Sequence, residues 1–246
     1  SWLSEILLGA GAQVMGYALA PPTTPALFDL LGLEKRITHH QADILDAARL
    51  AEALRESNAE IVFHLAAQPI VRKSYAEPAD TMATNIMGTV NLLEAIRHTP
   101  SAKSVIIVTS DKCYLNEETG TYYTENDKLG GKDPYSASKA AAEIVTHAYD
   151  ESYFAASKTA VASVRAGNVI GGGDWAQDRL IPDCARAAAS GASVSIRNPA
   201  STRPWQHVLE PLRGYMMLAE NLYTQGQKWR GGWNFGPVVD DIRPVS

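Results

Sequence analysis

A chain of 246 residues with 46% hydrophobic and 20% charged residues can bury a core, which excludes disorder over most of its length. Its formal charge of −5 argues against sequence-independent attraction to nucleic acid or to anionic membranes. Two cysteines provide neither a disulfide framework nor a metal-ligand cluster, and no apolar run is long enough to span a membrane. These features predict a globular protein of a reducing compartment, with the cytosol as the default location.

The chain opens with an amphipathic segment, 1–9, which predicts a helix that ends at a cap on Gly9. A strand at 12–17 is expected directly after it. Open α/β sheets normally begin with a strand and a Gly-rich turn whose amides receive a pyrophosphate. Since neither is present, we expect a fragment lacking the first strand, with a gap or an unpaired edge in the middle of its sheet.

Short β-branched runs then alternate with longer segments rich in alanine and leucine, which indicates stacked βαβ units. The further strands are expected at 37–43, 60–65, 104–108 and 159–165, and the helices between them at 46–57, 79–98 and 134–157. Runs such as IVFHLA and VIIVT are apolar on both faces, as expected of strands covered by helices on both sides. The pattern predicts a doubly wound, Rossmann-type α/β sheet.

The regularity weakens after residue 170, where three glycines stand together at 171–173 and prolines become frequent. Helices are expected at 179–190 and 209–223. We therefore predict two domains, a dinucleotide-binding domain at 1–170 and a smaller, partial substrate lobe at 171–246.

Tyr135 and Lys139 are the most distinctive local signal, because their spacing places both side chains on one face at the start of a predicted helix. An ammonium near a phenol favours the ionised phenol, which can then act as a general base. A bare YxxxK also occurs by chance at solvated helix starts.

Four polar residues follow the buried strand 104–108, at the sheet edge where ligands of open α/β folds bind. They are Thr109, Ser110, Asp111 and Lys112. An acid beside a base is what an elimination by proton transfer requires, although an ordinary turn also favours Ser and Asp.

A third candidate is the HLAAQ sequence at 64–68, where small side chains let a flat ligand approach the backbone. Simple helix–sheet packing explains these small residues equally well. Asp43 is either part of a helix cap or an adenine contact. Asn85 either supports the strand ends or is exposed.

Together, HLAAQ, TSDKCY, PYSASK and RAGNVIGGGDW resemble the extended short-chain dehydrogenase/reductase family. Within it, the segments ENDKLGGKDPYSASK, NVIGGGDWAQDRLIPD, TRPWQHV and GGWNFGP are similar to those of nucleotide-sugar 4,6-dehydratases and span nearly the whole chain. The departures are the missing Gly-rich fingerprint and ALAPP at 18–22, which offers no acidic residue for the ribose of NAD.

The resemblance implies the following chemistry. Tyr135 takes the proton of the sugar 4-hydroxyl while hydride passes to NAD, Lys139 holds the nicotinamide ribose, and Ser110 hydrogen-bonds the same sugar oxygen. Asp111 then protonates the leaving 6-hydroxyl and Lys112 acts as the base at carbon 5, where related enzymes have Asp-Glu. A lysine base must be unprotonated, and its ordinary pKa is about 10.4.

The resemblance also implies binding roles. The cofactor would contact Asp43, Ile44, Leu65, Ala66, Ala67, Asn85, Thr109, Tyr135 and Lys139. The nucleotide sugar would contact Gln68, Asn168, Arg179, Arg197 and Arg203. A homodimer through the helices 79–98 and 134–157 is implied as well. The alternatives are an epimerase or another dehydratase on the same scaffold, and an inactive fragment that retains the fold.

Overall fold

Parallel strands form the framework of the computed structural model, which describes residues 1–118, 120, 122–194, 196, 198–238 and 242–245. A four-stranded parallel sheet has the order β3 (Ile61–His64), β4 (Ser104–Val108), β5 (Ala160–Ala166) and β9 (Gly231–Phe235). A separate parallel pair consists of β1 (Met15–Ala18) and β2 (Thr38–Gln41). The predicted α/β fold with a parallel sheet is confirmed, and all five expected strands are present.

The chain packs as two compact units, the larger of which comprises residues 42–166 and 213–235. Besides the four-stranded sheet, it contains α3 (Ala47–Ser57), α4 (Val71–Ala76), α5 (Pro78–Met82), α6 (Gly88–Arg97), η3 (Asp111–Cys113), α7 (Pro134–Tyr149), η5 (Gly226–Trp229) and most of α9 (Leu209–Gln225). Two π-helical turns, η2 (Ala83–Met87) and η4 (Asp150–Phe154), extend α5 and α7. The helix expected at 79–98 is therefore α5, η2 and α6 in succession.

The core of this unit lies around β4 and β5, and all seven residues of β5 are buried. Ser104 of β4 donates its hydroxyl hydrogen to the Ala219 carbonyl of α9 at 2.8 Å. Ser163 of β5 donates to the Glu143 carboxylate of α7 at 2.7 Å. Since Ser104 is in register with Ala160, Ser104 and Ser163 point to opposite faces, so α9 and α7 cover the two sides of the sheet.

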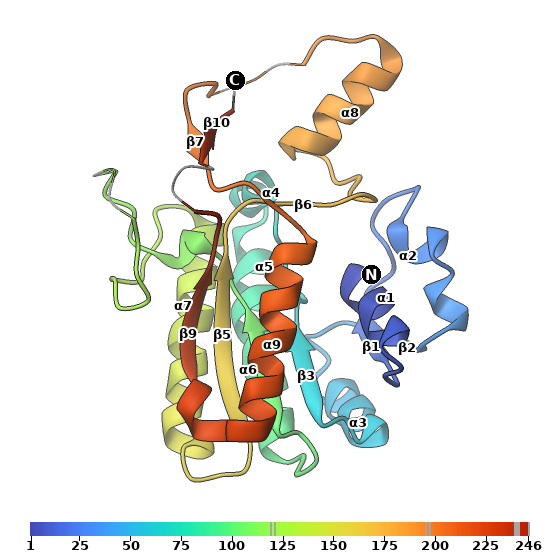
Figure 1. Ribbon diagram of the computed structural model, residues 1–246, viewed down its shortest axis with the longest axis vertical. Helices are drawn as coiled ribbons and strands as arrows, with labels where there is room; N and C mark the ends of the chain where they lie inside the picture. Colours follow the sequence, from blue (N-terminus) through green and yellow to red (C-terminus); the bar gives the residue numbers. More distant parts are fainter. Residues whose placement is uncertain (119, 121, 195, 197, 239–241, 246) are drawn as a thin grey trace. The chain divides into compact units, whose positions relative to one another are not determined.

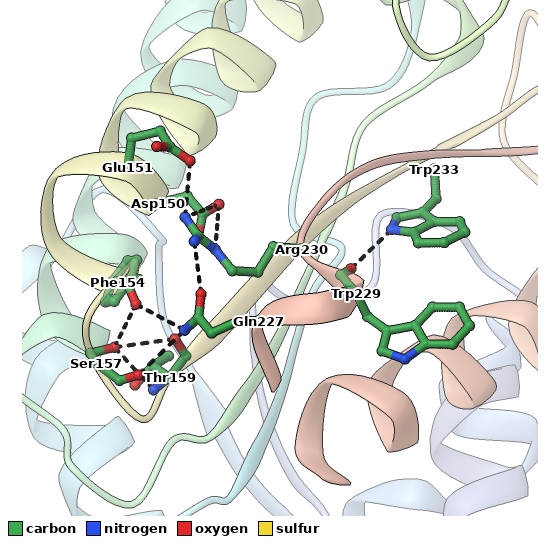
Figure 2. Close-up of polar contacts among 9 residues, drawn as sticks. All are labelled: Asp150, Glu151, Phe154, Ser157, Thr159, Gln227, Trp229, Arg230 and Trp233. Carbon is green, nitrogen blue, oxygen red and sulfur yellow. Dashed lines mark hydrogen bonds and ion pairs between the residues drawn. The ribbon is translucent and has the colours of Figure 1, made fainter. Parts of the chain in front are cut away.

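The edge strand β9, coloured dark red beside the yellow β5 in Figure 1, follows a short loop that an ion pair anchors. Figure 2 shows Arg230 reaching both carboxylate oxygens of Asp150, with Nε–O distances of 2.8 and 2.9 Å. Asp150 is buried in the turn that ends α7. The sequence analysis did not predict β9 as a strand.

The smaller unit comprises residues 1–41, 167–212 and 236–246. Besides β1 and β2 it contains α1 (Trp2–Gly9), α2 (Leu27–Leu30), η1 (Leu33–Lys35), β6 (Val169–Ile170), α8 (Leu180–Ser190), β7 (Thr202–Arg203), β8 (Gln206–His207) and β10 (Arg243–Pro244). The short strands pair as β6 with β8 and β7 with β10.

The predicted glycine cap of α1 is misplaced in the sequence analysis. Gly9 is the last helical residue, and the left-handed conformation belongs to Gly11, whose φ is 83°. The Gly11 amide donates to the Leu8 carbonyl, and the Ala12 amide donates to the Leu7 carbonyl. The helix thus ends at Gly9 as expected, but the capping glycine is Gly11, where glycine relieves the strain of a positive φ. No helix of the described residues is long and apolar enough to cross a bilayer.

Candidate active site

The start of α7 holds the Tyr135–Lys139 pair in place. Asp133 caps the helix by accepting hydrogen bonds from the Ser136 amide at 3.0 Å and the Ser136 hydroxyl at 2.6 Å, and Pro134 occupies the first helical position. Tyr135 and Lys139 are both buried, with relative exposures of 7% and 6%. A phenol and an ammonium in the first turns of one helix are thus withdrawn from bulk water, as proton transfer at this face requires.

Lys139 connects α7 to the end of β4. Its ammonium donates to the Val108 carbonyl at 3.1 Å, the acceptor found for it among the described residues. Burial lowers the pKa of Lys139 to about 8, against the opposing effects of the Glu143 carboxylate and of Cys113. Because an ammonium has three donors, the remaining ones can serve a ligand.

The polar strand end forms the short helix η3 and packs against α7. Ser110 caps η3 by accepting a hydrogen bond from the Lys112 amide at 3.2 Å, and its hydroxyl donates to the Asp111 carboxylate at 3.0 Å. Ser110 is buried, Asp111 is half-buried and Lys112 is exposed. The fold therefore brings the acid and the amine to the carboxyl edge of the sheet, next to the helix that carries Tyr135.

The segment after β3 is held from beneath by Asn85, which is 2% exposed in the turn η2. Its carboxamide accepts from the Gln68 amide at 2.8 Å and donates to the Gln68 carbonyl at 3.1 Å and to the Ser138 hydroxyl at 2.8 Å. Of the two readings offered by the sequence, Asn85 supports the strand end and is not exposed. It lies between this segment and α7.

Gln68 uses its own carboxamide inside the loop. It donates to the Thr81 hydroxyl at 2.9 Å and to the Ile70 carbonyl at 3.1 Å, and accepts from the Ile70 amide at 2.7 Å. Leu65 is 48% exposed, and Ala66 and Ala67 are half-buried. The small and exposed residues between His64 and Gln68 thus leave backbone accessible beside the strand end.

The expected adenine-contact residues begin the larger unit. Asp43 is exposed and accepts the Leu45 amide at 2.9 Å, while Ile44 is buried. A Cβ on Gly88 of α6 would lie 2.8 Å from Cγ2 of Ile44, so the glycine allows this close packing. Asp43 is consequently held at the surface, near the start of α3.

The expected nucleotide-binding residues belong to the smaller unit. The Asn168 carbonyl accepts the Gln206 amide at 3.0 Å, Arg179 pairs with Asp174 at 3.0 Å, and Arg203 donates to the Thr202 carbonyl at 2.8 Å. Both arginines retain partly exposed side chains. Arg197 lies outside the described residues.

The sequence analysis missed Glu143 and Arg165, which form a buried ion pair at 2.7 Å beneath the strand end. Glu143 accepts the Thr109 hydroxyl as well as Ser163 and Arg165. Its position one turn after Lys139 is the sequence signal that could have identified it, because residues four apart share a helix face.

Among curated relatives, the CDP-glucose 4,6-dehydratase of Salmonella typhimurium is 52% identical over 251 residues, covering 100% of this chain and 70% of the relative. The dTDP-glucose 4,6-dehydratase of Neisseria gonorrhoeae is 30% identical, covering 85% of this chain and 62% of the relative. Sequence similarity to sugar-nucleotide dehydratases thus extends across the chain.

Among solved structures, the dTDP-glucose 4,6-dehydratase DesIV of Streptomyces venezuelae, a double mutant with NAD bound, is 25% identical with a TM-score of 0.80, covering 96% of this chain and 72% of that one. The UDP-glucose 4-epimerase of Thermotoga maritima, at 20% identity and a TM-score of 0.84 over 99% of this chain and 74% of that one, shows the shared fold. A family model described as GDP-mannose 4,6 dehydratase matches residues 1–227. The resemblance inferred from the sequence is confirmed, and the chain belongs to this family of nucleotide-sugar dehydratases.

Proposed function

We propose that the protein carries out the NAD-dependent dehydration of CDP-glucose to CDP-4-keto-6-deoxyglucose. The observation that carries the proposal is the packing of η3, with Ser110, Asp111 and Lys112, against the helix that bears Tyr135 and Lys139. This arrangement supplies a phenol for oxidation and an acid–base pair for elimination. The identity of 52% with a CDP-glucose 4,6-dehydratase supports the choice of nucleotide.

We further propose the doubly wound Rossmann-type architecture. The parallel order of both ladders and the covering of both faces by α7 and α9 support it. The division into a dinucleotide-binding domain at 1–170 and a partial substrate lobe at 171–246 stays a prediction, because it concerns ligands rather than packing.

The residues present suit NAD. The buried Lys139 ammonium has donors beyond its bond to Val108, as needed to hold ribose hydroxyls, and Ala66 and Ala67 leave backbone accessible. The other residues of the proposed cofactor site are Asp43, Ile44, Leu65, Asn85 and Thr109. Asn85 would support the loop after β3, and Thr109 would fix the end of β4. When bound, NAD accepts hydride from sugar carbon 4 and returns it to carbon 6.

In the oxidation, Tyr135 removes the proton of the sugar 4-hydroxyl. The neighbouring Lys139 ammonium favours the phenolate electrostatically, and Ser110 donates a hydrogen bond to the same oxygen. These residues lie on α7 and at the end of β4, which the Lys139–Val108 bond ties together. The resulting 4-keto group acidifies the hydrogen on carbon 5.

In the elimination, Lys112 removes the proton from carbon 5, and the electron pair forms the bond between carbons 5 and 6. Asp111 protonates the leaving 6-hydroxyl, so that one water departs. Lys112 is exposed in the free protein, and the bound sugar would cover it. The conjugated ketone then accepts the returning hydride at carbon 6 and a proton at carbon 5.

The diphosphate requires positive charge in a protein of net charge −5. Arg179, Arg203 and Arg197 are proposed to provide it, because a guanidinium binds phosphate oxygens in a bidentate manner. Asn168 and Gln68 are proposed as further contacts of the nucleotide sugar. We also propose a homodimer through α6 and α7.

The substrate test uses the full-length protein with CDP-, dTDP- and UDP-glucose and with GDP-mannose. We expect the 4-keto-6-deoxy product, detected by its absorbance in base, from CDP-glucose. Dehydration of another nucleotide sugar with none of CDP-glucose would overturn the nucleotide assignment. Inversion at carbon 4 without loss of water would instead indicate an epimerase.

The base is tested with Lys112→Ala, which should still oxidise carbon 4, visible as a transient of reduced cofactor, but should lose at least about 100-fold in dehydration, the usual contribution of a general base. Lys132→Ala, which removes an exposed lysine just before α7, serves as the control and should dehydrate at the wild-type rate. A wild-type rate for Lys112→Ala would show that another group is the base.

A further inference from the structure

Glu143 lies one turn beyond Lys139 on α7 and is only 3% exposed. Its carboxylate accepts hydrogen bonds from the hydroxyls of Thr109 and Ser163, the latter at 2.7 Å, and from the Arg165 guanidinium at 2.7 Å. Thr109 directly precedes Ser110. The carboxylate therefore holds the first end of the segment that carries the candidate acid and base.

Arg165 on β5 holds the other end of the same segment. Its guanidinium donates to the Tyr114 hydroxyl at 2.8 Å and to the Glu125 carbonyl at 3.1 Å. Tyr114 directly follows η3, and its hydroxyl donates to Asn234 of β9 at 2.6 Å. One buried ion pair thus anchors both ends of residues 109–114, between which Asp111 and Lys112 lie.

Stability alone does not account for such a pair. Removing two charges from water is unfavourable, and apolar residues of similar volume often stabilise a core as well or better. Glu143 and Arg165, however, bind the two ends of residues 109–114 and so fix the position of this segment relative to α7.

The pair also governs the charges around Lys139. The groups that influence Lys139 are Glu143 on its own helix and Cys113 of η3, and Lys139 in turn influences His64 of β3. Burial lowers the pKa of Lys139, and the Glu143 carboxylate opposes that effect. Loss of this carboxylate would remove the opposing charge and leave the Arg165 cation uncompensated, so both changes would lower the pKa of Lys139 further.

We propose that Glu143 and Arg165 are positioning residues for the dehydration, which together hold the segment of Asp111 and Lys112 in register with Tyr135. This inference rests on the proposed function. It adds to that function two residues that would act through the segment, without touching the substrate.

The chain contains a matched control, the Asp150–Arg230 pair of Figure 2. It also joins a buried carboxylate at the end of α7 to an arginine, but its neighbours Glu151 and Gln227 do not belong to the proposed site. Asp150→Asn and Glu143→Gln therefore each remove the charge of a buried carboxylate that pairs with an arginine, although Arg230, 15% exposed, keeps Glu151 at 3.1 Å. They differ in which segment is released.

The experiment compares Glu143→Gln, Glu143→Asp and Asp150→Asn in the full-length protein. Three quantities are measured: resistance to urea, kcat and KM for dehydration, and the pH titration of the Lys139 side-chain carbon by NMR without cofactor or sugar. Lysine carrying ¹³C and a Lys139→Met spectrum provide the assignment.

We expect both neutral variants to lose urea resistance, but only Glu143→Gln to lose activity. Its kcat should fall at least about tenfold with KM nearly unchanged, since misplacement by about 1 Å costs on the order of 100-fold. Its Lys139 midpoint should move down by about one pH unit or more. Glu143→Asp should restore the midpoint of the Lys139 titration, because aspartate keeps the negative charge. It should restore only part of kcat, because the shorter side chain cannot reach all of its hydrogen-bond partners.

The proposal would be overturned if Glu143→Gln had the same kcat and the same pH midpoint of the Lys139 titration as Asp150→Asn. The Glu143–Arg165 pair would then be purely structural. If Glu143→Gln does not fold, the double variant Glu143→Gln/Arg165→Met is used instead, because it removes both charges. The double variant should fold but have a kcat at least about tenfold below that of the wild type. A wild-type kcat in the double variant would overturn the proposal. Failure of the wild type to dehydrate any nucleotide sugar would refute the proposed function, while the Lys139 titration would still report on the pair.

Discussion

Folding favours the neutral form of the His64 imidazole. Its ring lies 3.1 Å from the Thr89 hydroxyl and is 5% exposed, and burial, with a smaller contribution from the Lys139 ammonium, lowers its pKa to about 3. In the unfolded chain a histidine has a pKa of about 6.5. Between these values the unfolded state binds the proton and the folded state does not, so the free energy of unfolding falls as the pH drops through this window.

We expect the full-length protein to lose about 2 kcal/mol of stability between pH 7 and pH 5 through His64 alone. Urea unfolding at the two pH values measures this loss. His64→Gln should remove that part of the pH dependence, whereas His98→Gln, which replaces an exposed imidazole, should keep it. Equal pH dependence in the wild type and His64→Gln would contradict the assignment.

The turn before α7 is the element on which the position of Tyr135 depends. A Cβ on Gly131 would lie 2.4 Å from the Ala137 nitrogen and 2.5 Å from the Ser136 carbonyl carbon. Both are backbone atoms of the first helical turn and cannot move aside independently. The next residue back, Gly130, would meet only Leu115, at 3.3 Å from side-chain atoms.

Gly131→Ala should therefore destabilise the protein by about 3 kcal/mol, the upper part of the range for overpacked sites, and displace the first turn of α7. Because Tyr135 lies in that turn, kcat for dehydration should fall as well. Gly130→Ala should stay within about 1 kcal/mol of the wild type, since a flexible side chain can adjust. Urea unfolding and initial rates check both, and equal effects of the two substitutions would refute the packing argument.

The regular elements could be predicted from the sequence, because their patterns report burial directly. Apolar residues predominate in β4 (SVIIV) and β5 (AVASVRA), and the cap at Asp133 precedes a proline in the first turn. The sequence GGWNF of β9 contains no β-branched residue and begins with two glycines, so neither periodicity nor propensity indicated a strand. The residues proposed to touch ligands were predicted through their motif.

The spacing from Lys139 places Glu143 on the same helix face, but its pairing with Arg165 could not be predicted, because a charged residue in a buried pair has the same letter as one at the surface. Their partnership depends on the register of β4 with β5, which pairs Val108 with Val164 and so places Thr109 and Arg165 beside α7. Register is a property of the folded sheet and is not encoded in either segment alone.

At the scale of the whole molecule, α6 and α7 leave large apolar side chains exposed. Ile144 of α7 is 58% exposed, Tyr153 in the turn after it 50%, and Met87 just before α6 48%. Arg97 covers the Tyr153 ring at 4.7 Å. Apolar groups with a neighbouring cation–π contact are suited to pairing with a second copy, as the proposed homodimer requires.

Ile144→Arg should convert the full-length protein from dimer to monomer, because it would place a charge in a desolvated contact. Sedimentation equilibrium measures the change in mass. Met217→Arg, at a side chain of α9 that is 51% exposed, is the matched control and should leave the dimer intact. A dimer that persists in Ile144→Arg would exclude this face as the interface.

The burial of β5 has a consequence for how the protein opens. All seven of its residues are buried, and it has a hydrogen-bonded neighbour on each edge, whereas in the part of the chain that the structure describes β1 and β2 pair with each other alone. In hydrogen–deuterium exchange, the β5 amides should exchange only through global opening, while those of β1 and β2 should exchange through smaller, less costly fluctuations. The amides of β5, the strand that carries Arg165, would then be among the last to exchange. The strand beneath the candidate site would thus stay folded after β1 and β2 have begun to open.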